Sequence, residues 1–223
     1  MGALPIFYDK DAVMLSKSQR VDSRLDILLD AAAALFASQG YRETTMRDLG
    51  AAVSMLPGSI YYHFRSKDEL LVAVYSEGVR RLEEQVGRAL EGVEEPWSRF
   101  EAAVTAHLRA ILAPTAYARV LIRVLPDSAP KVARQLTRLR DTYEARMASV
   151  IDALPVRPGV DKKLLRFFVL GAANHTQLWF HAGPRSLEDV ARALVDTVAG
   201  RAKAIGPQPG EITAEDRGAQ RHG

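Results

Sequence analysis

Local helix signals follow one another closely at residues 44–71, whose sequence is TTMRDLGAAVSMLPGSIYYHFRSKDELL. Thr45 is followed three residues later by Asp48, a pairing that caps helix N-termini, and Ser66 begins a second pairing of this kind. Pro57 suits the first turn of a helix, because the N–H that it lacks would have no partner there. The stretch therefore predicts two short helices separated by a tight turn, followed by a long helix, over residues 45–53, 57–63 and 66–90.

The remainder of the chain also has helical character. A helix over residues 24–39 is expected to begin after Ser23 as its N-cap and to end at Gly40, a residue that readily adopts a left-handed conformation. No segment shows the β-branched alternation of a strand. Further helices are expected over residues 97–113, 117–125, 130–153, 161–182 and 187–203. The chain is therefore predicted to be all-α, with about nine helices.

The two short helices have the layout of a helix-turn-helix, in which the second helix enters the major groove of DNA. Such a helix must present small or polar groups outward, because its backbone approaches the base edges. Gly58 and Ser59 meet that requirement. Ile60 and Phe64, four residues apart, are expected to point into the core with Leu49. The segment therefore predicts a partner, double-stranded DNA.

The string Tyr61-Tyr62-His63-Phe64, with Lys67 and Glu69 after it, resembles the signature of the tetracycline-repressor (TetR) family of bacterial regulators, over about residues 24–72. The resemblance implies an all-helical homodimer that binds a palindromic operator through its N-terminal domains and a small-molecule effector through its C-terminal domain. By position, it implies phosphate contacts for Tyr61, His63 and Lys67. It implies contacts with bases or groove walls for Arg47, Pro57, Gly58, Ser59 and Tyr62, and with the DNA backbone for Thr45.

The turn departs from the family pattern. Ser54, Met55 and Leu56 stand where the family usually has Gly, an apolar residue and a Ser or Thr cap. Leu56 has no side-chain oxygen with which to cap a helix. Gly50 stands where Ala is usual, which lowers helix propensity. We expect the fold to tolerate both departures.

Four regions are expected along the chain. The first residues carry no sustained hydrophobic period, and the last are polar and rich in Pro and Gly, so both ends are expected to lack a packed structure. The predicted regions are a flexible arm over 1–20, a DNA-binding domain over 21–67, a ligand-binding and dimerisation domain over 68–205, and a disordered tail over 206–223.

The last two predicted helices, over 161–182 and 187–203, are expected to form the homodimer interface. Gly171, Ala172 and Ala173 are small enough for close helix approach. Apolar area would come from Phe167, Leu170, Leu178, Val190, Leu194 and Val198. The alternative is an ordinary buried helix pair within a monomer.

An effector pocket is expected to be mostly apolar with a few converging polar groups. Candidates are the polar or aromatic residues on otherwise apolar helices, namely His107, Tyr117, Tyr143, Asn174, His175, Gln177 and Trp179. Taken singly, each is more simply explained as a core or surface residue. Basic residues at helical spacing (Lys131, Arg134 and Arg138; Arg119 and Arg123) would suit the phosphates of an acyl-CoA, although a solvated face explains them more simply. The stretch over 55–59 and the junction over 179–184 also look similar to the corresponding parts of TetR-family regulators of fatty-acid or steroid catabolism.

Composition narrows the function classes. Without cysteine the chain has no disulfide and no thiolate metal site, and its histidines lack a carboxylate partner at ligand spacing, so neither a metal nor a cofactor is expected. No nucleophile elbow or phosphate loop supports an enzyme. The net charge of +3 is too small to argue for DNA binding by itself. No apolar run approaches the ~20 residues of a membrane span, and no signal peptide is evident, so a cytoplasmic protein is expected.

The sequence therefore predicts a TetR-type regulator, acting as a repressor that an effector releases from its operator. One alternative is a ligand-independent DNA-binding protein on the same fold, such as a nucleoid-organising or division factor. A C-terminal domain without a cavity would favour that alternative. Another is a helical protein-interaction module that has lost DNA binding.

Overall fold

The computed structural model describes residues 17–181 and 183–200, and every regular element among them is a helix. The absence of strands from this part of the chain confirms the predicted all-α class. In chain order the elements are α1 (Lys17–Ser38), α2 (Met46–Ala52), α3 (Pro57–His63), α4 (Lys67–Leu90), α5 (Pro96–Leu112), α6 (Ala116–Arg123), the 3-10 turn η1 (Pro126–Ser128), α7 (Ala133–Asp152), α8 (Lys162–Trp179) and α9 (Leu187–Val198).

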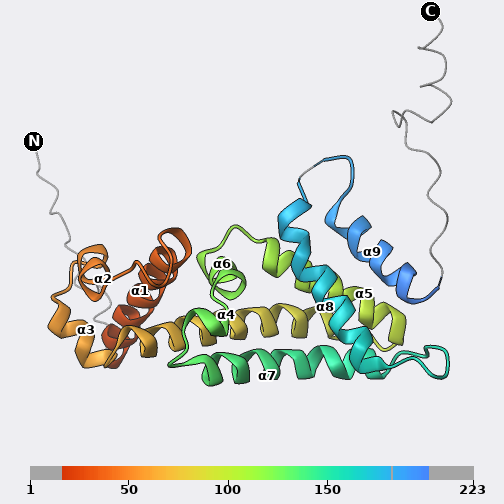
Figure 1. Cartoon of the computed structure of the whole chain (residues 1–223), viewed down its shortest axis with the longest axis horizontal. Coiled ribbons are helices and arrows are strands. Elements are labelled where there is room, and N and C mark those ends of the chain that lie inside the picture. Colours follow the sequence, from red (N-terminus) through yellow and green to blue (C-terminus); the bar gives the residue numbers. More distant parts are fainter. Residues whose placement is uncertain (1–16, 182, 201–223) are drawn as a thin grey trace, which may run out of the picture.

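The helices form a small N-terminal group and a larger group joined by α4. In Figure 1, α1, α2 and α3 gather at one end, and α4 runs from them along the length of the molecule beside α7. α4 packs against α5, α6, α7 and α1, while α8 and α9 pack against α5 toward the other end. The long helix α4 therefore belongs to both groups.

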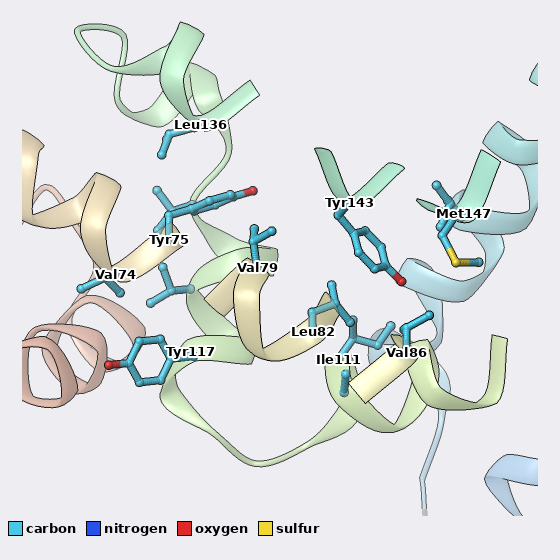
Figure 2. Close-up of a cluster of buried hydrophobic side chains, with 14 of the residues drawn as sticks. Val74, Tyr75, Val79, Leu82, Val86, Ile111, Tyr117, Leu136, Tyr143 and Met147 are labelled. Carbon is cyan, nitrogen blue, oxygen red and sulfur yellow. The ribbon is translucent and has the colours of Figure 1, made fainter. Parts of the chain in front are cut away.

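The core follows the apolar stripe of α4. Figure 2 shows Val74, Val79 and Leu82 on successive turns of this helix, with Leu136 and Met147 of α7 on the facing side. These side chains are buried, and fully burying one of their size contributes about 1.5–3 kcal/mol. Packing along α4 therefore holds the larger group together.

Capping signals predicted several helix starts correctly. Thr45 caps α2 in a complete capping box with Asp48, and Ser186 does the same for α9 with Asp189. The Ser66 hydroxyl accepts a hydrogen bond from the Glu69 N–H at the start of α4. Each of these caps is a contact between residues three apart, so the local sequence was enough to find it.

Two helix ends differ most from prediction, the start of α1 and the end of α9. α1 begins at Lys17 rather than after Ser23, so Ser23 lies inside the helix and the predicted cap is wrong. Residues 17–22 contain no Pro or Gly that would stop the helix from extending upstream. Four residues of the predicted arm thus belong to α1, while residues 1–16 lie outside the described part. α9 ends at Val198 rather than at 203, because Gly200 with its φ of 67° ends the helix. The predicted tail also lies outside the described residues.

None of the helices within residues 17–181 and 183–200 is both long and apolar enough to cross a membrane.

Candidate functional site

Helix α3 has a buried face and an exposed face. Ile60 is fully buried and Phe64 nearly so, and both belong to the same core as Leu49 of α2, as predicted. On the other face Tyr61 is half exposed and Tyr62 is 87% exposed. Their hydroxyl groups are available to contact phosphates or base edges. α3 therefore has the profile of a helix that docks on a partner through its outer face.

Gly58 and Ser59 contribute little side-chain volume to the outer face of α3. Both residues are exposed, and a Cβ built on Gly58 would meet no atom within 4 Å. Packing within the chain therefore does not require glycine at this position. Pro57 begins α3, but its side chain is not among the described ones.

The turn between α2 and α3 is a Schellman motif. The Met55 N–H donates to the Gly50 carbonyl at 2.9 Å, and the Ser54 N–H donates to the Ala51 carbonyl at 3.4 Å. Ser54 has a φ of 53°, a left-handed conformation that is strained for any residue with a Cβ. A Cβ on Gly50 would lie 2.7 Å from the Met55 carbonyl oxygen, too close for the turn to form unchanged. Gly50 is thus required by the turn. Leu56 supplies no cap, as predicted, and is 78% exposed.

The N-terminus of α2 is rigidly capped. The Thr45 hydroxyl accepts from the Asp48 N–H at 3.2 Å, and the Asp48 carboxylate accepts from the Thr45 N–H at 2.9 Å and from its hydroxyl at 2.7 Å. These hydrogen bonds lower the pKa of Asp48. The Thr45 hydroxyl is therefore engaged in the cap, while Arg47 on the first turn is exposed.

Lys67 lies at the start of α4, but its ammonium group turns back to the loop between α1 and α2. Its Nζ donates to the carbonyl oxygens of Tyr41 at 2.6 Å, Arg42 at 3.0 Å and Thr44 at 2.8 Å. An ammonium group has three protons, so all of its donors are used. Partial burial lowers the pKa of Lys67, although the Asp68 carboxylate beside it opposes that change.

The same loop is held by an aromatic side chain. The Lys67 ammonium lies 4.5 Å from the centre of the Tyr41 ring, and the Tyr41 hydroxyl donates to the Asp68 carboxylate. Burial and this carboxylate raise the pKa of Tyr41. We call Lys67, Tyr41 and Asp68 the loop clasp, because together they hold the loop against the first turn of α4.

Helix α6 connects the larger group to α1. The Tyr117 hydroxyl donates to Asp30 at 2.9 Å, and the Arg123 guanidinium donates to the Ala37 carbonyl at 3.1 Å. The Arg81 guanidinium of α4 lies over the Tyr117 ring, 4.1 Å from its centre. These contacts couple α6 directly to α1, so a movement of α6 would displace α1.

A cavity of about 300 Å³ lies among α4, α5, α6, α7 and α8. This volume is at the lower end of the range for small-molecule sites. Much of its wall is apolar, and Figure 2 shows Val79, Leu82 and Ile111 among the side chains that contribute. The polar lining residues are Tyr75, His107, Arg140, Tyr143, Glu144, Asn174, His175 and Gln177.

Three of these polar residues form a hydrogen-bonded chain. His107 Nδ1 lies 2.6 Å from the Tyr143 hydroxyl, and His107 Nε2 lies 3.1 Å from Asn174 Oδ1. The His107 and Tyr143 rings stack with their centres 5.6 Å apart. Burial lowers the pKa of His107 to about 4 and raises the pKa of Tyr143. Both side chains are therefore neutral at pH 7.

Comparison with known proteins decides the family. The family model "Bacterial regulatory proteins, tetR family" matches residues 28–74. A second model, "Tetracyclin repressor-like, C-terminal domain", matches residues 93–201. The chain belongs to the TetR family. Its members are transcriptional regulators, and the two matches together span most of the small group and most of the larger one.

Relatives agree in length and fold. The transcriptional repressor KstR2 of Mycobacterium tuberculosis is 27% identical over 191 residues, which cover 81% of this chain and 94% of KstR2. The crystal structure of the superantigen PfiT is 32% identical, with a TM-score of 0.71, over 79% of this chain and 96% of PfiT. AibR in complex with isovaleryl coenzyme A and operator DNA has a TM-score of 0.67 at 22% identity, over 78% of this chain and 97% of AibR, and this likeness is one of fold.

The structure brings most of the predicted ligand residues of this TetR-family chain together. His107, Tyr143, Asn174, His175 and Gln177 all line the cavity, whereas Tyr117 and Trp179 do not. Tyr117 instead links α6 to α1, and Trp179 is half exposed at the end of α8. Sequence reasoning missed Tyr75, Arg140 and Glu144. Tyr75 occupies a core position on α4, and the sequence pattern does not distinguish it from other core residues.

The basic residues proposed for an anionic effector do not line the cavity. Arg134 and Arg138 are exposed on α7, and Lys131 lies 4.0 Å from Asp68. Arg123 is bonded to α1 as described above. Arg140, two residues beyond Arg138 on α7, does line the cavity. The exposure of Arg119, Arg134 and Arg138 agrees with a solvated face, the simpler explanation of their spacing.

Proposed function

We propose that this protein is a ligand-responsive repressor, in which a homodimer binds a palindromic operator through α3 and an effector in the cavity releases it. The observation that carries the proposal is the outer face of α3. Its small and hydroxyl-bearing residues are exposed, while Ile60 and Phe64 anchor the helix from behind. A helix so anchored presents base-reading groups without changing the core. Such a regulator acts in the cytoplasm, where the bacterial DNA lies.

The outer face divides into two kinds of DNA contact. We assign Tyr61 and His63, at the end of α3, to the phosphates. We assign Arg47 and Tyr62, with Pro57, Gly58 and Ser59, to bases or groove walls, and the N-terminus of α2 at Thr45 to the DNA backbone. Lys67 is left out of this set, because a phosphate contact would require its ammonium group to leave three carbonyl oxygens. Phosphate contacts set affinity for all DNA, whereas base contacts set preference among sequences.

A gel shift with DNA flanking the gene, with scrambled DNA as competitor, tests the proposal. The expected result is a discrete complex that scrambled DNA does not remove. Tyr62→Ala should weaken it about fivefold or more, since one or two hydrogen bonds of about 1–1.5 kcal/mol each are lost. Thr142→Ala, an exposed change on α7, is the matched control and should bind normally. A complex that scrambled DNA removes equally well would refute sequence-specific binding.

The dimer surface is the outer face of α8. Leu164, Phe168, Leu178 and Trp179 are each at least half exposed, and their spacing places them along one side of the helix. A Cβ on Gly171, on the same side, would meet no atom within 4 Å. An apolar strip of this kind on a DNA-binding subunit fits a second copy of the same chain.

The predicted interface residues are divided between this face and the subunit's own core. Phe167 and Leu178 are exposed, as the interface requires, whereas Leu170 and Ala173 are buried within the subunit. The apolar residues of α9 (Val190, Leu194 and Val198) pack partly against the subunit's core, and Ala172 is exposed. In our proposal α8 therefore supplies most of the apolar contact area and α9 flanks it.

Phe168→Glu is expected to separate the dimer. Phe168 is 72% exposed in the single chain, and a carboxylate buried in its place without a partner costs about 3 kcal/mol or more. The dimer Kd should therefore rise at least a hundredfold. Sedimentation equilibrium at micromolar concentration measures the change, and Ala145→Glu on the exposed side of α7 is the control. A Phe168→Glu protein that remains fully dimeric would exclude this face.

The effector acts through the helices that line the cavity. We propose that a ligand among Leu121, Ile122 and Leu125 displaces α6, which moves α1 through the contacts of Tyr117 and Arg123 and swings α4 with it. The separation of the two α3 helices would change as a result. A coupling of about 1–3 kcal/mol makes a useful switch. An operator affinity that stays constant at saturating effector would disprove this mechanism.

The cavity supports the ligand-responsive version of this function over a ligand-independent one, because a solid core would leave no room for an effector. An acyl-CoA is one candidate, with its acyl group among the apolar walls and its phosphates outside. Arg140 lines the cavity and, like the residues predicted to contact the phosphates, has a cationic side chain. Thermal stabilisation of the protein by acyl-CoA esters tests this candidate, and an absence of stabilisation would count against it.

A further inference from the structure

The polar chain in the cavity has a defined direction. His107 is neutral at pH 7 and so carries a single ring proton. Asn174 Oδ1, 3.1 Å from Nε2, is a carbonyl oxygen and only accepts, which places the proton on Nε2. Nδ1 is then an acceptor, and the Tyr143 hydroxyl at 2.6 Å must donate to it. The only hydroxyl proton of Tyr143 is therefore used in this hydrogen bond. Toward a ligand, the Tyr143 oxygen can act only as an acceptor.

A second hydroxyl in the cavity is available to a ligand. Tyr75 is only 2% exposed and lines the cavity, and its hydroxyl makes no hydrogen bond to a residue that the structure describes. Burial raises its pKa, so it too is neutral. The oxygen is not one of the fully buried, unpaired side-chain atoms in the described part of the chain, so it remains accessible. The Tyr75 hydroxyl is therefore available to a polar atom of a molecule in the cavity.

The buried part of that molecule must be uncharged. His107, Tyr75 and Tyr143 are the deeply buried polar residues of the lining, and all three are neutral. The charged lining residues differ: Arg140 is exposed and Glu144 is half-buried. A charge placed among the buried groups would lose its hydration without gaining a partner of opposite charge. An anion could lie only beside Arg140.

We propose that the cavity binds an alcohol on an apolar skeleton, whose hydroxyl donates a hydrogen bond to the Tyr143 oxygen. The skeleton lies against Val79, Leu82 and Ile111, and Tyr75 is available to a further oxygen of the ligand. A ketone of the same shape lacks the proton that Tyr143 requires, and a carboxylate lacks the proton and adds a charge. Binding of the alcohol does not depend on the proposed function. Only the further statement that this alcohol is the effector rests on it.

Three eight-carbon probes, octan-1-ol, octan-2-one and octanoate, test the proposal by isothermal titration with the full chain in the absence of DNA. Octan-1-ol should bind about tenfold more tightly than octan-2-one, which is the worth of one buried hydrogen bond, and octanoate should bind most weakly. Because no DNA is present, the result does not depend on whether the protein is a repressor. Release of the operator by octan-1-ol is measured separately.

Variants identify the group responsible. Tyr143→Phe should abolish the preference for octan-1-ol, and Tyr117→Phe should keep it, because Tyr117 is equally buried but bonds to Asp30 outside this cavity. Asn174→Ala, at an exposed position, removes the acceptor that holds the His107 proton on Nε2, so the proton can occupy either ring nitrogen. This variant should reduce the preference for octan-1-ol, and it tests the proposal even if Tyr143→Phe does not fold. Equal affinity for the three probes, tightest binding of octan-2-one or octanoate, or no binding at all would each overturn the proposal.

Discussion

Replacing Lys67 by alanine is expected to lower the free energy of unfolding by about 2 kcal/mol without changing the salt dependence of DNA binding. The ammonium group satisfies three backbone carbonyls in the loop after α1, and hydrogen bonds to charged groups are worth about 1.5–3 kcal/mol each. The expected loss is smaller than their sum, because Lys67 is only partly buried and water can reach the vacated carbonyls. Denaturant unfolding measures the stability, and binding at several salt concentrations measures the slope.

Arg47→Ala is the matched comparison for Lys67→Ala. Arg47 is exposed on α2, so its loss should leave stability unchanged and alter the preference among DNA sequences. Ser59→Ala should behave in the same way. If Lys67→Ala instead left stability unchanged and reduced the salt slope, Lys67 would be a phosphate contact, as the family resemblance implies, and the loop clasp would have no energetic role.

Lys67 also illustrates what the sequence does not contain. Its position at the start of α4 follows from the local cap at Ser66, and the family resemblance then implied a phosphate contact. Its actual partners lie 23 to 26 residues earlier in the chain, in a loop whose carbonyl directions depend on the left-handed Gly40. Periodicity and capping describe contacts within a helix turn or two, so they cannot find a partner at that distance.

The cavity residues likewise separate what local sequence predicts from what depends on contacts between distant segments. Helical periodicity placed His107, Tyr143 and Asn174 on helices, and the structure brings them together within 3.1 Å. It did not separate them from Tyr117, because a polar group on an apolar helix can face either a cavity or a neighbouring helix. The turn was more predictable: Gly50 and Ser54 were recognised as departures, and the close approach of the Met55 carbonyl shows why Gly50 is needed. What was missed depends on the packing of helices far apart in the sequence.

Acid is expected to destabilise this protein through His107, by up to about 3 kcal/mol. The pKa of His107 is about 4 in the folded chain, against an ordinary value of 6.5. Between these values the unfolded chain binds the proton and the folded chain does not. The free energy of unfolding is therefore constant above pH 6.5 and falls as the pH is lowered toward 4. Each pH unit in this window corresponds to about 1.4 kcal/mol.

His107→Gln is expected to remove this loss, because glutamine offers a donor and an acceptor but does not titrate. Denaturant unfolding of both proteins from pH 8 to pH 4.5 measures the difference. Glu77 interferes little, since its pKa is held at about 2 by Arg80 and Arg81 and its contribution declines only below about pH 4.5. Thr142→Ala, the exposed change on α7 that does not alter a titratable group, should retain the wild-type slope. Parallel curves for wild type and His107→Gln would mean that His107 accepts a proton without leaving its hydrogen-bonded chain, and the direction inferred for that chain would then have to be abandoned.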